Sequence, residues 1–169
     1  MYYKTQLLKE HSKANTNLIA KQIGNNAEEF NKIIEIIYNQ EAPLPQRAAW
    51  LLATVNQKHP ALLTPYIPQF IETIQKFKID GIKRHILLVL ASQVIPQPLQ
   101  AKLIDICFEF ILSPSEAVAV KVHAMQIIAN LAKQYPPLKG ELKSVINQQL
   151  PKSTAAFSAR AKRILKEME

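Results

Sequence analysis

The chain has 169 residues, of which 48% are hydrophobic, and it carries a formal net charge of +8. This length suits one continuous core, so we expect a single domain over residues 1–169. Only 3 glycines are present beside 11 prolines, which argues against a β-sandwich or barrel with many glycine turns and favours helices joined at prolines.

No segment of the sequence predicts export or insertion into a membrane. The N-terminal sequence MYYKTQLLKEHSK lacks the apolar stretch of a secretory signal peptide. The longest uncharged apolar run, residues 86–95, is well short of the roughly 20 residues that a membrane span requires. The single cysteine, Cys107, lies in an apolar run and is expected to be a small buried hydrophobic residue. We therefore expect a cytoplasmic protein with no membrane partner.

The first half of the chain predicts helices separated by clear stop signals. Residues 1–25 favour two short helices that end at Gly24. Asn26 followed by Glu29 is typical of an N-terminal capping box, and apolar residues then recur every three or four positions over 27–40. The next helices are expected over residues 43–59, 64–79 and 80–95, with Pro60 after the first of them and Pro68 tolerated in the second.

The second half continues the same pattern. Ser113 is expected to cap a helix whose first residue is Pro114 and which extends to Tyr135. This helix is apolar nearly all round, so it is predicted to be covered on more than one side. The remaining helices are expected over residues 99–112, 138–150 and 155–168, which gives about ten in all.

The helix ends repeat along the sequence. Pro60, Pro96 and Pro136 each follow one helix and precede the next, at intervals of 36 and 40 residues, so a two-helix unit repeats. The segment LLTPYIPQFIETIQKFKIDGIKRHILLVLAS resembles one complete HEAT repeat. It combines a proline, Pro68, with an acidic turn residue, Asp80, and a basic residue early in the second helix, Lys83 or Arg84. SPSEAVAVKVHAMQIIANLAK is similar to a second-helix segment, with Lys121 in the basic position.

This resemblance implies an all-α, right-handed α-α superhelix of stacked antiparallel helix pairs. Residues 26–169 would form the repeats and residues 1–25 the N-terminal capping helices. In HEAT-like arrays the second helices line a concave groove. The second helices expected here, residues 43–59, 80–95, 115–135 and 154–169, carry 10 basic and 4 acidic residues, against 6 basic and 7 acidic in the first helices, residues 26–40, 64–79, 98–112 and 138–150.

Basic residues repeated once per unit would form a ladder along such a groove, because packed helices lie about 8–10 Å apart. Such a ladder would bind an acidic segment of another protein or a nucleic-acid backbone. Alternatively, the repeated basic position only caps the turn acid of a neighbouring repeat. The candidate ladder residues are Arg47, Lys83, Arg84, Lys121, Arg160 and Arg163.

No residue pattern predicts catalysis, a metal, a cofactor or a small-molecule substrate. Asp105 and Glu109 share a helix face but are more typical of solvated charges, and His85 and His123 supply too few ligands for a metal. We expect a non-catalytic interaction or scaffold module for an acidic or extended protein partner. The alternative is a nucleic-acid-binding module related to the alkylpurine DNA glycosylases, which hold DNA in a basic HEAT-like groove with aromatic side chains. Trp50 and Tyr66 permit that analogy.

Overall fold

The structure is all-helical, as expected. It is a computed structural model that describes residues 1–169 and contains ten α-helices and no strand. Short 3-10 helices lie at Pro60–Leu62, Thr64–Tyr66, Ile74–Lys76 and Leu150–Lys152. None of the helices is both long enough and apolar enough to cross a membrane. The helices are α1 (Tyr2–Lys9), α2 (Lys13–Ile23), α3 (Ala27–Asn39), α4 (Leu44–Asn56), α5 (Ile67–Thr73), α6 (Asp80–Ser92), α7 (Gln97–Leu112), α8 (Val118–Leu131), α9 (Pro137–Gln149) and α10 (Ala155–Glu167).

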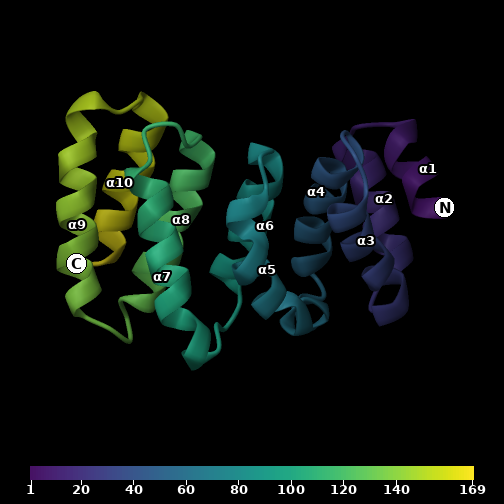
Figure 1. Cartoon of the computed structure of the whole chain (residues 1–169), viewed down its shortest axis with the longest axis horizontal. Coiled ribbons are helices and arrows are strands. Elements are labelled where there is room, and N and C mark those ends of the chain that lie inside the picture. Colours follow the sequence, from purple (N-terminus) through teal and green to yellow (C-terminus); the bar gives the residue numbers. More distant parts are fainter. The chain divides into compact units, whose positions relative to one another are not determined.

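The helices pack into two compact units, Met1–Val89 and Leu90–Glu169, and the division falls inside α6. In sequence order they form five pairs, α1–α2 through α9–α10, each with a first and a second helix. The helices α7 and α8 of one pair stand side by side and antiparallel (Figure 1). That all of residues 1–169 make one domain stays a prediction.

In the unit Met1–Val89, the second helices of neighbouring pairs pack together. Helix α2 packs on α4, which also contacts α3 and α1. The core of this unit is built from fully buried side chains such as Phe30 of α3, Leu51 of α4 and Phe70 of α5. Gly24 ends α2 with a positive φ of 53°, a conformation that glycine adopts without strain. The side chain of Asn26 then accepts hydrogen bonds from the amides of Glu28 and Glu29, which confirms the predicted cap of α3.

In the unit Leu90–Glu169, α8 is the central helix. It packs against α7, α9 and α10, and its buried residues come from all round the helix, including Val120, Met125 and Leu131. The apolar sequence of α8 predicted this position, because a helix without a polar face must be covered on several sides. The second helices α8 and α10 therefore lie in contact, as α2 and α4 do in the other unit.

Side-chain hydrogen bonds link residues one repeat apart. Tyr38 of α3 shares a hydrogen bond of 2.8 Å with Thr73 of α5, 35 residues later. Asn130 of α8 donates to the carbonyl oxygen of Ala91 in α6, 39 residues earlier. The amide of Gln149 in α9 donates to the carbonyl oxygen of Ile111 in α7, 38 residues earlier. These separations of 35, 38 and 39 residues are close to the predicted repeat of 36 to 40 residues.

Two predicted helix starts are wrong. Ser113 does not cap α8, because residues 113–117 form a turn and the helix begins at Val118 with no side-chain cap. The helix predicted over 64–79 is interrupted: two 3-10 segments flank α5, and Pro68 lies in the first turn of α5 rather than inside a longer helix. Proline is accepted there because the first-turn amides have no intrahelical partner.

Candidate partner-binding surface

The positive charge of the chain is concentrated on the second helices. With the bounds that the structure gives, α2, α4, α6, α8 and α10 carry 10 basic and 2 acidic residues, whereas the five first helices carry 6 basic and 7 acidic residues. Each unit contributes five of those 10 basic residues and one of the acids. These counts include α1 and α2, which lie in the part of the chain left out of the sequence count. Over α3–α10 alone, the second helices carry 8 basic and 2 acidic residues and the first helices 4 basic and 7 acidic residues.

Two of the predicted ladder residues are engaged inside their own unit. The guanidinium of Arg47 on α4 donates hydrogen bonds to the carbonyl oxygens of Leu7, at 2.7 Å, and Leu8, at 3.4 Å, at the end of α1. Lys83 on α6 is only 9% exposed, and its ammonium lies 3.7 Å from the carboxylate of Asp80. These contacts give Arg47 and Lys83 partners within the fold. Neither contact is with the turn acid of a neighbouring repeat, because Arg47 binds backbone carbonyls and Lys83 pairs with Asp80 of its own repeat.

Arg84 differs from both neighbours in the ladder. Its side chain is exposed and makes no ion pair, and it lines a cavity of about 430 Å³ at the second helices of the unit Met1–Val89. The indole of Trp50 forms part of the wall and meets the imidazole of His11 edge-on, with ring centroids 5.3 Å apart. The cavity is lined by His11, Gln46, Trp50, Gly81, Arg84 and His85.

His85 is a neutral group in this cavity. Its Nδ1 lies 2.7 Å from the carbonyl oxygen of Gly81, which can only accept, so Nδ1 carries the proton and Nε2 keeps a lone pair. Burial lowers the pKa of His85. The hydrogen bond with Gly81 opposes this shift, and the nearby charge of Arg84 adds to it, so the pKa stays below its ordinary value. Gln46, in the same wall, has its Oε1 buried without a hydrogen-bond partner. Arg84 is thus the only full charge that is fixed in the lining.

In the unit Leu90–Glu169, the three remaining ladder residues lie on the contacting helices α8 and α10. Lys121 lines a cavity of about 410 Å³ together with Glu116, Lys152 and Thr154, which caps α10. The Nε of Arg160 is buried without a hydrogen-bond partner. Arg163 is exposed and pairs with Glu167 one turn later, at 3.2 Å. The structure therefore leaves Lys121 as the ladder residue of this unit that lines a cavity.

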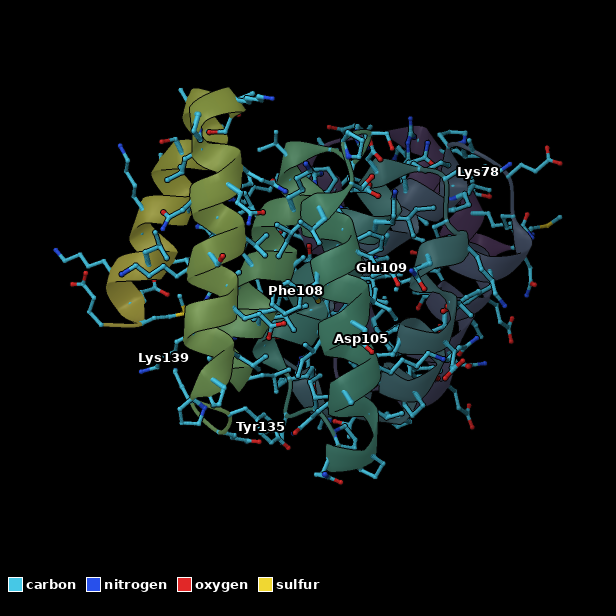
Figure 2. All side chains as sticks on the ribbon, turned by 60° about the vertical axis from the view of Figure 1, so that its left-hand side comes forward. Lys78, Asp105, Phe108, Glu109, Tyr135 and Lys139 are labelled. Atoms are coloured by element: carbon cyan, nitrogen blue, oxygen red, sulfur yellow. The ribbon has the colours of Figure 1, made fainter.

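The first helices of the same unit present a different surface. A groove of about 490 Å³ between α7 and α9 is lined largely by apolar groups, including Ile104 and Leu138. Its buried polar residue, Gln100, is satisfied, because its amide donates to the carbonyl of Ile95 and its oxygen accepts from the hydroxyl of Tyr135. Tyr135 lies in the connection between α8 and α9, at one end of this region (Figure 2).

The residues considered for catalysis or metal binding lie on three helices: Asp105 and Glu109 on α7, His85 on α6 and His123 on α8. Asp105 and Glu109 project from the same face of α7 (Figure 2) and are exposed. No group of three or more histidine, cysteine, aspartate or glutamate residues is placed to hold a metal ion. Cys107 is fully buried in α7, and burial raises the pKa of its thiol far above the usual range, so it is the buried apolar residue that the sequence predicted.

Comparison with known protein families identifies the architecture. The family model for the HEAT repeat domain matches residues 3–168. The chain belongs to the HEAT repeat family. HEAT repeat domains are in general helical scaffolds for protein interactions rather than catalysts, and the helix pairs seen here are those of such a scaffold. No curated protein and no solved structure matches the chain.

Three of the residues that line the cavity around Trp50 and Arg84 were not predicted from the sequence. Sequence reasoning singled out Trp50, Arg84 and His85 but not His11, Gln46 or Gly81. His11 precedes α2 and Trp50 lies inside α4. The starts of these two helices are 31 residues apart, whereas the two rings are 39 residues apart, so the repeat does not place them at equivalent positions. Gln46 and Gly81 also carry no signal, because nothing in their neighbourhood distinguishes a cavity wall from an ordinary helix start.

Proposed function

We propose that the protein is a non-catalytic scaffold that binds an acidic, extended segment of another protein on its second helices. The observation that supports this proposal is the segregation of charge, 10 basic to 2 acidic residues on the second helices against 6 to 7 on the first. A surface with one sign of charge attracts partners of the opposite sign and raises their rate of association. Arg84 in the unit Met1–Val89 and Lys121 in the unit Leu90–Glu169 are basic residues of second helices that line cavities.

Nucleic acid is the competing partner, because it also presents regular negative charge. A nucleic-acid strand is bound by neutralising several phosphates with basic side chains. In the unit Met1–Val89 two of the three ladder residues are instead engaged by carbonyl oxygens or a carboxylate, namely Arg47 and Lys83. A partner with fewer, separated charges suits this surface better than a continuous phosphate backbone.

The test is fluorescence anisotropy with a labelled glutamate-rich peptide and, in parallel, a single-stranded DNA oligomer of equal charge. We expect the peptide to bind and its affinity to fall as salt rises, because exposed charges are screened. Tighter binding of the DNA oligomer would support the nucleic-acid function instead. Absence of peptide binding at low salt would overturn the proposal.

A matched pair of variants separates local binding from net charge. The double variant Arg84→Glu/Lys121→Glu reverses two charges on the second helices. The control Lys76→Glu/Lys139→Glu reverses two exposed charges outside the second helices. Lys76 ends the 3-10 helix that follows α5, and Lys139 projects from α9 (Figure 2). Both double variants lower the net charge by the same amount, so a difference between them reports the position of the charges. We expect only Arg84→Glu/Lys121→Glu to lose peptide binding. Equal loss of peptide binding in the two double variants would show that the peptide responds to overall charge and not to Arg84 and Lys121.

A further inference from the structure

The cavity around Trp50 and Arg84 combines three chemical features in one wall. Trp50 supplies a half-buried aromatic surface, and Arg84 supplies an exposed cation. His85 and Gln46 supply neutral polar groups, of which the buried Oε1 of Gln46 has no partner. Side-chain pockets that anchor a peptide are typically apolar with a few placed polar groups, and tryptophan and arginine are the residues that most often dominate such contacts.

The charge of this cavity selects the chemistry of its occupant. No acidic residue lines it, and the closest acid in sequence, Asp80, is turned toward Lys83. Arg84 makes no ion pair, so a carboxylate from the occupant would meet an unneutralised guanidinium. A planar guanidinium is suited to bind a carboxylate with two parallel hydrogen bonds. With one such cation in the lining, the cavity suits one carboxylate and not a run of phosphates.

We propose that this cavity anchors one apolar residue and one neighbouring acidic residue of the bound segment, with the carboxylate on Arg84 and the apolar side chain against Trp50. The inference rests on the proposed function and specifies its partner: an acidic peptide that contains large apolar residues, not one made of acids alone. A backbone amide of the same segment is the group that would relieve the unpaired oxygen of Gln46, which is costly to leave buried.

Trp50 makes the proposal directly measurable, because it is the only tryptophan of the chain. Two labelled peptides without tryptophan or tyrosine serve as probes: one alternates glutamate with leucine, and the other replaces each leucine by serine at the same charge. Anisotropy of the label reports binding anywhere on the protein, and tryptophan emission reports contact at this cavity. We expect the leucine peptide to bind more tightly and to change the emission of Trp50, whereas the serine peptide changes it little.

The variant Arg84→Gln tests the carboxylate contact while keeping a long polar side chain. We expect this variant to lower the affinity for the leucine peptide by about tenfold, because one charge-assisted hydrogen-bonding contact is lost. The control Lys139→Gln removes an exposed charge from the first helix α9, outside the second helices, and should change affinity less than twofold. Circular dichroism of each variant establishes that the fold is kept.

Trp50→Leu supplies a second, independent variant. It keeps an apolar wall but removes the indole, and we expect weaker binding of the leucine peptide with the serine peptide unaffected. If both peptides bind with equal affinity and the Trp50 emission is unchanged, the anchor is overturned while the proposed function stands. If neither peptide binds, the proposed function falls. If single-stranded DNA binds and quenches Trp50, the occupant is a nucleic acid and both proposals are overturned.

Discussion

Replacing Arg47 by alanine should destabilise the fold through its contact with α1. The carbonyl oxygens of Leu7 and Leu8 belong to the last turn of α1, where helix carbonyls have no intrahelical donor. A hydrogen bond from a charged donor contributes about 1.5–3 kcal/mol, and a cation at a helix C-terminus about 0.3–1 kcal/mol at exposed sites. Because Arg47 is only partly buried, we expect a loss of about 2 kcal/mol in the free energy of unfolding.

Urea denaturation followed by circular dichroism measures this loss, and hydrogen exchange of the α1 amides shows where it acts. The matched control is Arg163→Ala, whose exposed pair with Glu167 is expected to contribute at most about 0.5 kcal/mol. Arg47→Met separates the guanidinium from its aliphatic stem, and we expect it to lose nearly as much as alanine. If Arg47→Ala keeps the stability of the unmodified protein but loses peptide binding, Arg47 acts in the ladder and the structural role is refuted.

Four further predictions follow from buried groups and from the unit boundary. Tyr135→Phe should cost about 1–3 kcal/mol in a denaturant titration, because the oxygen of buried Gln100 loses its donor; an unchanged midpoint would mean that water replaces the hydroxyl. Burial lowers the pKa of His85 below its ordinary 6.5, so the unfolded chain binds this proton at higher pH than the folded one. The contribution of this residue to the free energy of unfolding is therefore full at pH 7 and is lost as pH falls below about 6.5. His85→Gln should flatten that part of the curve of stability against pH. A variant curve parallel to that of the unmodified protein would assign the pH dependence to other groups. Cys107→Ser should cost about 1–3 kcal/mol of unfolding free energy, because its hydroxyl would be buried in an apolar site; rapid reaction of the native thiol with a thiol reagent would contradict this burial. Because the unit boundary lies inside α6, calorimetry should give one unfolding transition over residues 1–169, and two resolved transitions would indicate two domains.

The helix pairs could be predicted from sequence because their signals are local. Apolar periodicity identified the helices, and the prolines at positions 60, 96 and 136 set the length of the repeat. The same locality explains the errors. The sequence around Ser113 has the residues of a cap, but the helix starts five residues later, and no local preference reveals that the intervening residues form a turn.

The candidate site was less predictable than the fold, because its chemistry depends on partners that are distant in sequence. Arg47, Lys83 and Arg84 look alike as basic residues early in second helices. The structure distinguishes them: the carbonyl oxygens bound by Arg47 lie 39 and 40 residues away, Lys83 is buried beside Asp80, and Arg84 faces a cavity. Charge counts could locate the layer but not the residues within it that remain open to a partner.

The hydrogen bonds between Tyr38 and Thr73, and between Gln149 and Ile111, bear on how such a chain can change length. When an entire helix pair is duplicated or deleted, the hydrogen bonds among the other pairs are kept, because each pair of a repeat protein contacts only its neighbours. Inserting two or three residues within a helix instead rotates everything beyond the insertion and breaks these links on one side. A change in length by a full helix pair is therefore expected to disturb the fold less than an insertion of two or three residues.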